Sequence, residues 1–166
     1  KILAGGKQIV LGGTVSDNVI EGTQDIKGGA ANNNTVDATG VQNVISGTAT
    51  GNTIGGTQNV NGGIATNNIV ENKGVQNVVA GTVSVTTLEN GGSQVVSGGV
   101  VSETTINEGS QEVHAGQVND TIINAGTATY QGGTIKTTTL NNGTANFQNG
   151  TIQDTTINAG TASFQG

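Results

Sequence analysis

The sequence lacks several residue types that most folded proteins use. Its 166 residues include no cysteine, proline, methionine or tryptophan, and the aromatic residues are one tyrosine and two phenylalanines. Without cysteine, no disulfide bond can stabilise the fold. With so few bulky side chains, the chain cannot fill a thick globular core. We therefore expect a thin core made of small and branched residues.

Charge is scarce as well. Charged residues make up 10% of the chain, arginine is missing, and the net charge is -6. This low charge density is not typical of an acidic disordered tail. The shortage of cations argues against nucleic acid or anionic lipid as a partner. No apolar run approaches the roughly 20 residues that a membrane-spanning helix requires.

Residues that could carry catalysis are few and dispersed. His114 is the only histidine, and no cysteine can act with it. Four acids, Asp17, Glu103, Asp120 and Asp154, share one repeat position but belong to different repeats. The calcium-binding repeat GGxGxD is missing. We therefore expect no catalytic, cofactor-binding or metal site and no enzyme activity, with a β-helix polysaccharide-degrading enzyme as an alternative.

Glycine, by contrast, is abundant, with 29 residues, and it recurs within a repeat of 16 to 18 residues. Ser93–Gly109 (SQVVSGGVVSETTINEG) is one complete unit. We number each unit from the residue that we call position 0. Position 0 is occupied by Gln8, Gln24, Gln42, Gln58, Gln76, Gln94, Gln111, Ala128, Ala145 and Ala162. A unit this short cannot bury a core alone, so the units must stack and share one.

Three apolar positions recur in every unit. Position +2 is apolar from Val10 to Phe164, position +7 from Val15 to Ile152, and position +12 from Ile20 to Ile157. Polar residues alternate with them, which is the period of a strand with one buried face. Where position +2 becomes aromatic, position 0 changes from Gln to Ala, which keeps the summed volume similar. We therefore expect positions 0, +2, +7 and +12 to point into the core.

Glycine also has fixed places, at positions +5 and −2 of nearly every unit. Such regularity predicts two corners per turn that need a positive φ or a close backbone approach, as at Gly99 and Gly116. All variation in repeat length falls between position +12 and the next position 0, so this edge is the variable loop. Short strands between glycine corners predict an all-β parallel β-helix of nine to ten turns with about 17 residues per turn.

Polar residues also form columns. Position +10 changes from Asn to Thr along the chain, and Asn107, Asn124, Asn141 and Asn158 share position +13. Stacked amides or hydroxyls can bond to one another along the axis. Position −1 is mostly Ser or Thr, and position +11 is mostly Thr. A Thr ladder also suits an ice-binding solenoid, but Val19, Ile69 and Ile122 interrupt this one, so ice binding is the weaker alternative.

The pattern GG-x-Q-x-V-x-GG-x-x-x-x-[TN]-x-[IV], found in Gly55–Val70 and Gly91–Ile106, resembles the repeats of self-associating autotransporter passengers. These are the AIDA-type adhesins, with TibA-like and antigen-43-like members. The resemblance covers the whole chain and is weakest in the last three units. It implies a right-handed parallel β-helix, and residues 1–166 would be one segment of a longer passenger domain. It places that passenger on the bacterial surface, anchored in the outer membrane through a C-terminal β-barrel outside this sequence.

The resemblance also implies a function, namely adhesion, autoaggregation and biofilm formation. Its implied partners are a second copy of the protein, the host cell surface and a cytoplasmic heptosyltransferase that modifies Ser or Thr before export. Hydroxyls in or beside the short Q-x-V strand match the acceptor context, and outward hydroxyls at position +8 come next. The candidate glycosylation residues are Ser46, Ser93, Ser97, Ser110, Ser84 and Ser102.

Overall fold

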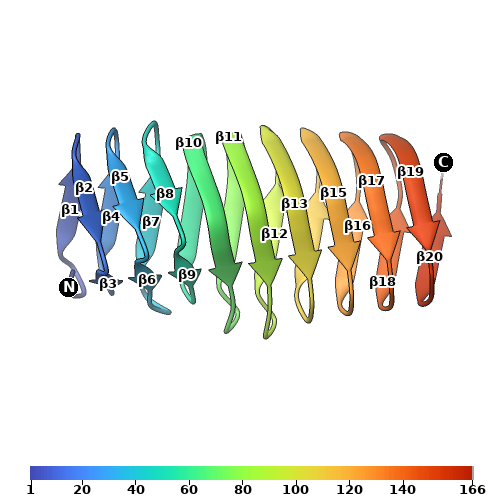
Figure 1. The fold of residues 1–166 in the computed structure, drawn as a ribbon, viewed down its shortest axis with the longest axis horizontal. Coiled ribbons are helices and arrows are strands. Elements are labelled where there is room, and N and C mark those ends of the chain that lie inside the picture. The colour runs from blue at the N-terminus through green and yellow to red at the C-terminus, as the bar shows by residue number, and fades with distance from the viewer. Residues whose placement is uncertain (166) are drawn as a thin grey trace.

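The structure is a computed structural model that describes residues 1–165. Those residues form twenty β-strands and no helix, wound into a parallel β-solenoid of about nine turns with about 17 residues per turn. Successive turns stack side by side along a straight rod (Figure 1). Since there is no helix among the described residues, none can span a membrane. The predicted fold class is confirmed.

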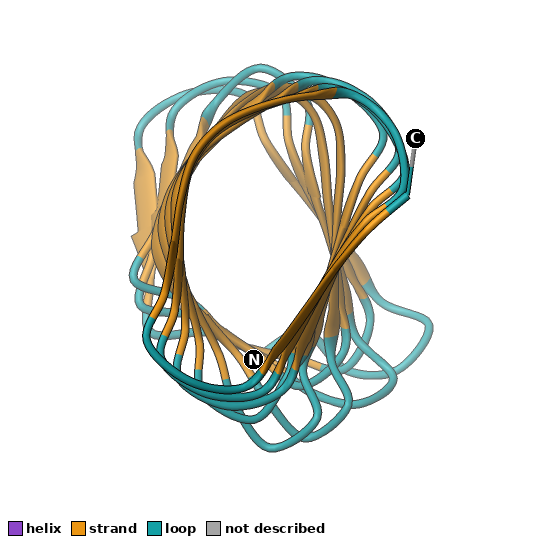
Figure 2. Ribbon diagram, turned by 90° about the vertical axis from the view of Figure 1, so that its right-hand side faces the viewer, coloured by secondary structure: helices purple, strands orange, loops and turns teal. Residues whose placement is uncertain are grey.

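Viewed along the rod, each turn has two strand-bearing walls joined by loops, and successive turns are rotated relative to one another (Figure 2). We call the wall that carries positions −1 to +2 the first wall. Its own strands are β1 (Lys7–Val10), β4 (Thr23–Ile26), β7 (Val41–Val44), β12 (Ser93–Val96), β14 (Ser110–Val113), β16 (Thr127–Tyr130), β18 (Thr144–Phe147) and β20 (Thr161–Phe164). Two longer strands turn the corner and belong to both walls: β10 (Thr57–Val70) and β11 (Val75–Leu88).

The second wall carries positions +6 to +12. In the first three turns it is split into pairs of short strands, β2 (Thr14–Ser16) and β3 (Val19–Ile20), β5 (Ala30–Asn32) and β6 (Thr35–Val36), and β8 (Thr48–Thr50) and β9 (Thr53–Ile54). In the last four turns it is one seven-residue strand per turn, namely β13 (Val100–Ile106), β15 (Gln117–Ile123), β17 (Thr134–Leu140) and β19 (Thr151–Ile157).

Strands of successive turns pair in parallel, and equal repeat positions face each other except at Asn61, which pairs with Ala80 at an irregularity between β10 and β11. Gln76 pairs with Gln94, Val83 with Val101, and so on along the rod. This register places like residues about 4.8 Å apart. Side chains at positions 0, +2, +7 and +12 are buried in nearly all turns, as predicted, and Val96, Val101 and Ile106 are fully buried. In the last described turn, Ile157 and Phe164 are exposed because a neighbouring turn covers only one side.

The seven glutamines at position 0 form a continuous ladder inside the rod. Each Gln Nε2 donates to the Gln Oε1 of the preceding turn, from Gln24 onto Gln8 up to Gln111 onto Gln94, at 2.6–2.8 Å. The bonds satisfy amides that would otherwise cost free energy in the interior. A ladder therefore lets a polar residue occupy a core column.

Position +10 is also buried and faces the glutamines. Asn34 Nδ2 donates to Asn52 Oδ1, and Asn52 Nδ2 donates to Asn68 Oδ1, so these amides bond along the axis as expected. The threonines that follow differ from the expectation. The Thr86, Thr104 and Thr121 hydroxyls donate across the core to the glutamine of their own turn, at 3.4–3.5 Å. For these buried hydroxyls, the glutamine oxygen on the opposite wall is the acceptor within the same turn.

In the last turns, stacked aromatic rings replace the glutamine ladder. The ring centroids of Tyr130 and Phe147 are 4.9 Å apart, and those of Phe147 and Phe164 are 4.7 Å apart. Ala128 and Ala145 are buried beside them, so both positions point inward as predicted. Burial raises the pKa of the Tyr130 phenol. Among the described residues, the Tyr130 hydroxyl has no hydrogen-bond partner.

The glycine corners behave as expected, and the structure adds a third corner. Gly99 and Gly116 have φ of 74° and 94°, and an added Cβ would lie within 2.8 Å of a carbonyl oxygen of the preceding turn. The third corner is position +9, where Asp17, Glu103 and Asp120 also have positive φ. This left-handed residue divides the second wall and keeps position +10 inward. The acids at this position therefore have a backbone role.

Candidate functional site: the outward columns of the two walls

The outward threonines of the second wall form one line along the rod, which we call the Thr column. It comprises Val19, Thr35, Thr53, Ile69, Thr87, Thr105, Ile122, Thr139 and Thr156 at position +11. Each member pairs with the next through the strand register, as Thr87 does with Thr105 and Thr139 with Thr156. Ile69 and Ile122 are 40% and 41% exposed. The column is therefore a ridge of β-branched residues, part hydroxyl and part apolar, without charge.

On the first wall, position −1 is the second outward line, which we call the Ser/Thr column. Its hydroxyl residues are Thr23, Thr57, Ser93, Ser110, Thr127, Thr144 and Thr161, with Val41 and Val75 between them. The register pairs Ser93 with Ser110 and Ser110 with Thr127. The two columns lie on different walls, so a ligand or partner that covers one wall does not cover the other.

The loop edge carries an external ladder of hydrogen-bonded asparagines. Asn124 Nδ2 donates to Asn107 Oδ1, Asn141 to Asn124, and Asn158 to Asn141, at 2.8–3.0 Å. This confirms the predicted role of the Asn run at position +13. Asn107 Nδ2 in turn donates to the Glu89 carboxylate at 3.1 Å. A carboxylate can only accept, so Glu89 suits the end of the ladder toward which every amide donates.

The first wall repeats this arrangement. Asn77 donates to Asn59, Asn59 to Asn43, and Asn43 to the Asp25 carboxylate at 2.7 Å. Lys7 Nζ lies 2.7 Å from the other oxygen of Asp25. The Asn43 hydrogen bond, together with Lys7, holds the pKa of Asp25 below its usual value. Asp25 is 5% exposed, and its charge is stabilised by these contacts.

The six candidate glycosylation serines do not form one site. Ser93 and Ser110 lie in neighbouring turns of the first wall, and Ser84 and Ser102 lie in neighbouring turns of the second wall. Ser46 and Ser97 lie at the corner between the walls. Ser46, Ser97 and Ser110 are exposed, whereas the other three are half-buried. The Ser84 hydroxyl donates to the Thr66 hydroxyl at 3.1 Å, and that of Ser46 donates to the Lys27 carbonyl.

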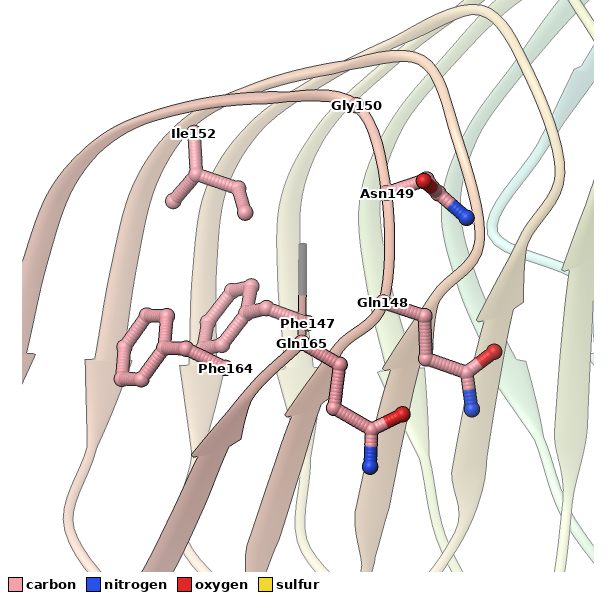
Figure 3. A pocket seen from close by; sticks show the side chains of 7 residues that line it. All are labelled: Phe147, Gln148, Asn149, Gly150, Ile152, Phe164 and Gln165. Atoms are coloured by element: carbon pink, nitrogen blue, oxygen red, sulfur yellow. The ribbon is translucent and has the colours of Figure 1, made fainter.

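Of two hollows on the surface of the described residues, neither brings together a catalytic set. One, of about 310 Å³, lies over the last described turn and is lined by Phe147, Ile152, Phe164 and neutral polar residues (Figure 3). The other, of about 280 Å³, lies at the loop edge between Glu89, Asn90, Asn107 and Glu108.

The charged groups that could carry chemistry lie apart. His114 Nε2 lies 3.6 Å from Glu112 on the surface, and both side chains are more than 40% exposed. Within residues 1–165, no three His, Cys, Asp or Glu side chains are grouped closely enough to hold a metal ion.

Comparison with known proteins does not assign the chain to a family. No protein-family model matches the sequence, and no curated protein matches it significantly.

Proposed function

We propose that this chain is a segment of a self-associating bacterial surface adhesin of the AIDA type, and that it contacts a second copy through the second wall. The observation that carries the proposal is the Thr column, whose members are held in register turn after turn. An uncharged line of like residues in register is self-complementary along its length. Neither of the two hollows described above is lined by a residue of this column.

Association of two rods through these contacts requires a long contact surface, because each contact is weak. An exposed hydroxyl contributes about 1 kcal/mol at best through one hydrogen bond. Two rods laid side by side make many such contacts at once, and the second and later contacts form at high effective concentration. Ile69 and Ile122 add apolar area that water leaves on association. Two such rods on neighbouring cells would hold those cells together, and the same wall would serve for attachment to a host cell surface.

The proposal includes O-linked heptose on some of the candidate serines. Ser93 and Ser110 lie on the first wall, away from the Thr column, so sugars there would leave the second wall free. A heptosyltransferase acting before export would reach all six serines while the chain is unfolded. An intact mass of the protein made with and without such an enzyme tests this part, because each heptose adds one fixed increment. An unchanged mass would remove the modification and leave the association untouched.

Cell aggregation tests the association. The variant carries Thr87, Thr105, Thr139 and Thr156 all changed to Lys, which places like charge along the second wall without touching the core. The matched control carries the same number of lysines on the first wall, at Thr23, Thr57, Thr127 and Thr144. We expect cells that display the second-wall variant to stay dispersed and cells that display the control to aggregate. Aggregation of both, with folding intact by circular dichroism, would rule out the Thr column.

A further inference from the structure

The loops contain three Asn–Gly pairs that differ in one structural respect. The pairs are Asn90–Gly91, Asn142–Gly143 and Asn149–Gly150, and all lie outside strands. All three asparagines are exposed. In the close-up of the last turns, the Asn149 side chain points away from the core (Figure 3). The side-chain amides are therefore open to solvent in each pair.

The difference lies in the glycine nitrogen. Gly91 N donates to the Glu108 carbonyl oxygen at 3.2 Å. Within residues 1–165, neither Gly143 N nor Gly150 N donates to any acceptor of the chain. The neighbouring residues do make ladder bonds, since Thr144 N donates to Gly126 O and Thr151 N to Gly133 O. Gly143 and Gly150 therefore offer a backbone nitrogen that is not held in the ladder.

From this geometry we infer that Asn142 and Asn149 are sites of spontaneous deamidation, and that Asn90 is protected although its sequence context is the same. A free glycine nitrogen next to an unrestrained asparagine side chain can reach Asn Cγ, because glycine has no side chain to block the approach. A nitrogen whose proton is held by a carbonyl oxygen is both harder to deprotonate and fixed in direction.

The reaction needs only water and base. The Gly143 amide nitrogen gives up its proton and forms a bond to Asn142 Cγ, and the Cγ–Nδ2 bond breaks, so that Nδ2 leaves as ammonia. Water then opens the resulting succinimide at either carbonyl, which yields an aspartyl or an isoaspartyl link. Overall, an amide and a water become a carboxylate and an ammonium ion. The same steps apply at Asn149 with the Gly150 nitrogen.

Deamidation would change the rod in two ways. Each event adds one negative charge. At Asn142 the charge lies beside the exposed loop ladder, whose asparagines from Asn107 to Asn158 are uncharged, and at Asn149 it lies at the opposite corner, between β18 and β19. An isoaspartyl link also lengthens the backbone by one methylene at a tight corner. A Cβ added at Gly160 would lie 2.6 Å from Gly143 O, and Thr161 N donates to that oxygen. The lengthened corner therefore cannot keep its contact with the next turn.

The asparagines of the loop ladder are protected by a different contact. Asn141 lies next to Asn142, but its Nδ2 donates to Asn124 and its Oδ1 accepts from Asn158. A side-chain amide held at both ends cannot rotate toward its own backbone. If the proposed association through the second wall holds, accumulation of charge beside it would weaken that association as the protein ages.

The test is residue-resolved mass spectrometry of the whole protein after prolonged incubation at mildly alkaline pH. The folded protein and the same protein in denaturant are compared, because unfolding removes the Gly91 bond and makes the three pairs equivalent. We expect Asn142 and Asn149 to gain one mass unit several-fold faster than Asn90 in the folded protein, with isoaspartate detected at both, and similar rates for all three in denaturant. Asn142→Ser and Asn149→Ser variants should remove the corresponding signals. Equal rates for all three pairs in the folded protein, or protection of all three relative to denaturant, would overturn the inference.

Discussion

The two ends of the rod share one backbone but fill it differently. In turns up to about residue 111, the core contains a hydrogen-bonded Gln ladder beside Val and Ile, repeats are 16 to 18 residues long, and the loop edge carries charged residues such as Glu71, Lys73 and Glu89. From residue 128 onward, Ala and stacked aromatic rings replace the ladder, every repeat has 17 residues, and the loop edge carries uncharged Asn. The first arrangement derives stability from satisfied amides and the second from aromatic packing. A parallel solenoid accepts either, because stacking like on like suits both.

The largest effect should come from a charge placed in the apolar core, which both regions share. Ile106→Asp would bury an unpaired carboxylate in the common core and should lower the free energy of unfolding by several kcal/mol. Denaturant titration followed by circular dichroism measures this loss. The control is Thr105→Asp, which adds the same charge to the outward neighbour and should cost little. Similar losses in both variants would mean that the assigned register is wrong.

The aromatic region should be broken next most strongly by Phe147→Ala. Phe147 is 1% exposed and stacks on two rings, so its removal leaves a cavity and interrupts the stack. Truncation of a buried phenylalanine costs about 3–5 kcal/mol. Hydrogen exchange should show the loss of protection concentrated in residues 128–164, with the first turns little changed. A uniform loss along the rod would mean that the two regions unfold as one unit.

The ladder region should be broken by Gln58→Ala. This change leaves Gln76 Nε2 and Gln42 Oε1 buried without their partners. Each orphaned group costs about 1–3 kcal/mol. Gln58→Glu is an informative companion, since a carboxylate can accept from Gln76 but cannot donate to Gln42. If Gln58→Ala were as stable as wild type in chemical denaturation, the ladder would contribute nothing.

A smaller effect on the free energy of unfolding should depend on pH and arise from Asp25, in the first turns. The pKa of Asp25 lies below its ordinary value of 3.8 in the folded protein, so the ionised carboxylate stabilises the fold at higher pH. That contribution should be complete above about pH 4 and should be lost as the pH falls below that value. Asp25→Asn keeps the acceptor for Asn43 but removes the pair with Lys7. The stability difference between wild type and Asp25→Asn should therefore shrink on acidification, and a difference that grows instead would contradict the assignment.

The smallest effect is expected where the two regions join in the core. The Tyr130 hydroxyl is buried without a partner among the described residues. Tyr130→Phe removes only that oxygen and continues the phenylalanine column of the following turns. We expect a free energy of unfolding that is equal to that of wild type or slightly higher, as measured by thermal denaturation. A clear loss would reveal a hydrogen bond, direct or through water, that links Tyr130 to Thr121 or Thr138.

The apolar columns and the glycine corners could be predicted from sequence because each repeats one requirement of the fold at a fixed position. The third corner could not, since only glycine was expected to adopt positive φ. The sequence did contain a signal, because Asn33 and Asp120 are of residue types that tolerate a positive φ. Val85 occupies the same position and also has a positive φ, although valine rarely adopts this conformation. Four acids were accordingly considered as functional groups when three of them, Asp17, Glu103 and Asp120, have a backbone explanation.

The ladders were only partly predictable. The Asn runs at positions +10 and +13 indicated axial hydrogen bonds, but the roles of Asp25 and Glu89 as acceptor ends depend on which amide faces which neighbour. The hydroxyls of Thr86 and Thr104 bond across the core, and this depends on the distance between the walls, which no repeat pattern encodes. The outward columns were predicted as lines of like residues, and their function depends on a partner.

Sedimentation equilibrium of the purified segment tests the central claim most directly. We predict a concentration-dependent association of the wild-type rod that persists when Thr23, Thr57, Thr127 and Thr144 are changed to Lys on the first wall. It should be lost when Thr87, Thr105, Thr139 and Thr156 are changed to Lys on the second wall. A second-wall variant that remains folded and associates as strongly as wild type would contradict the account.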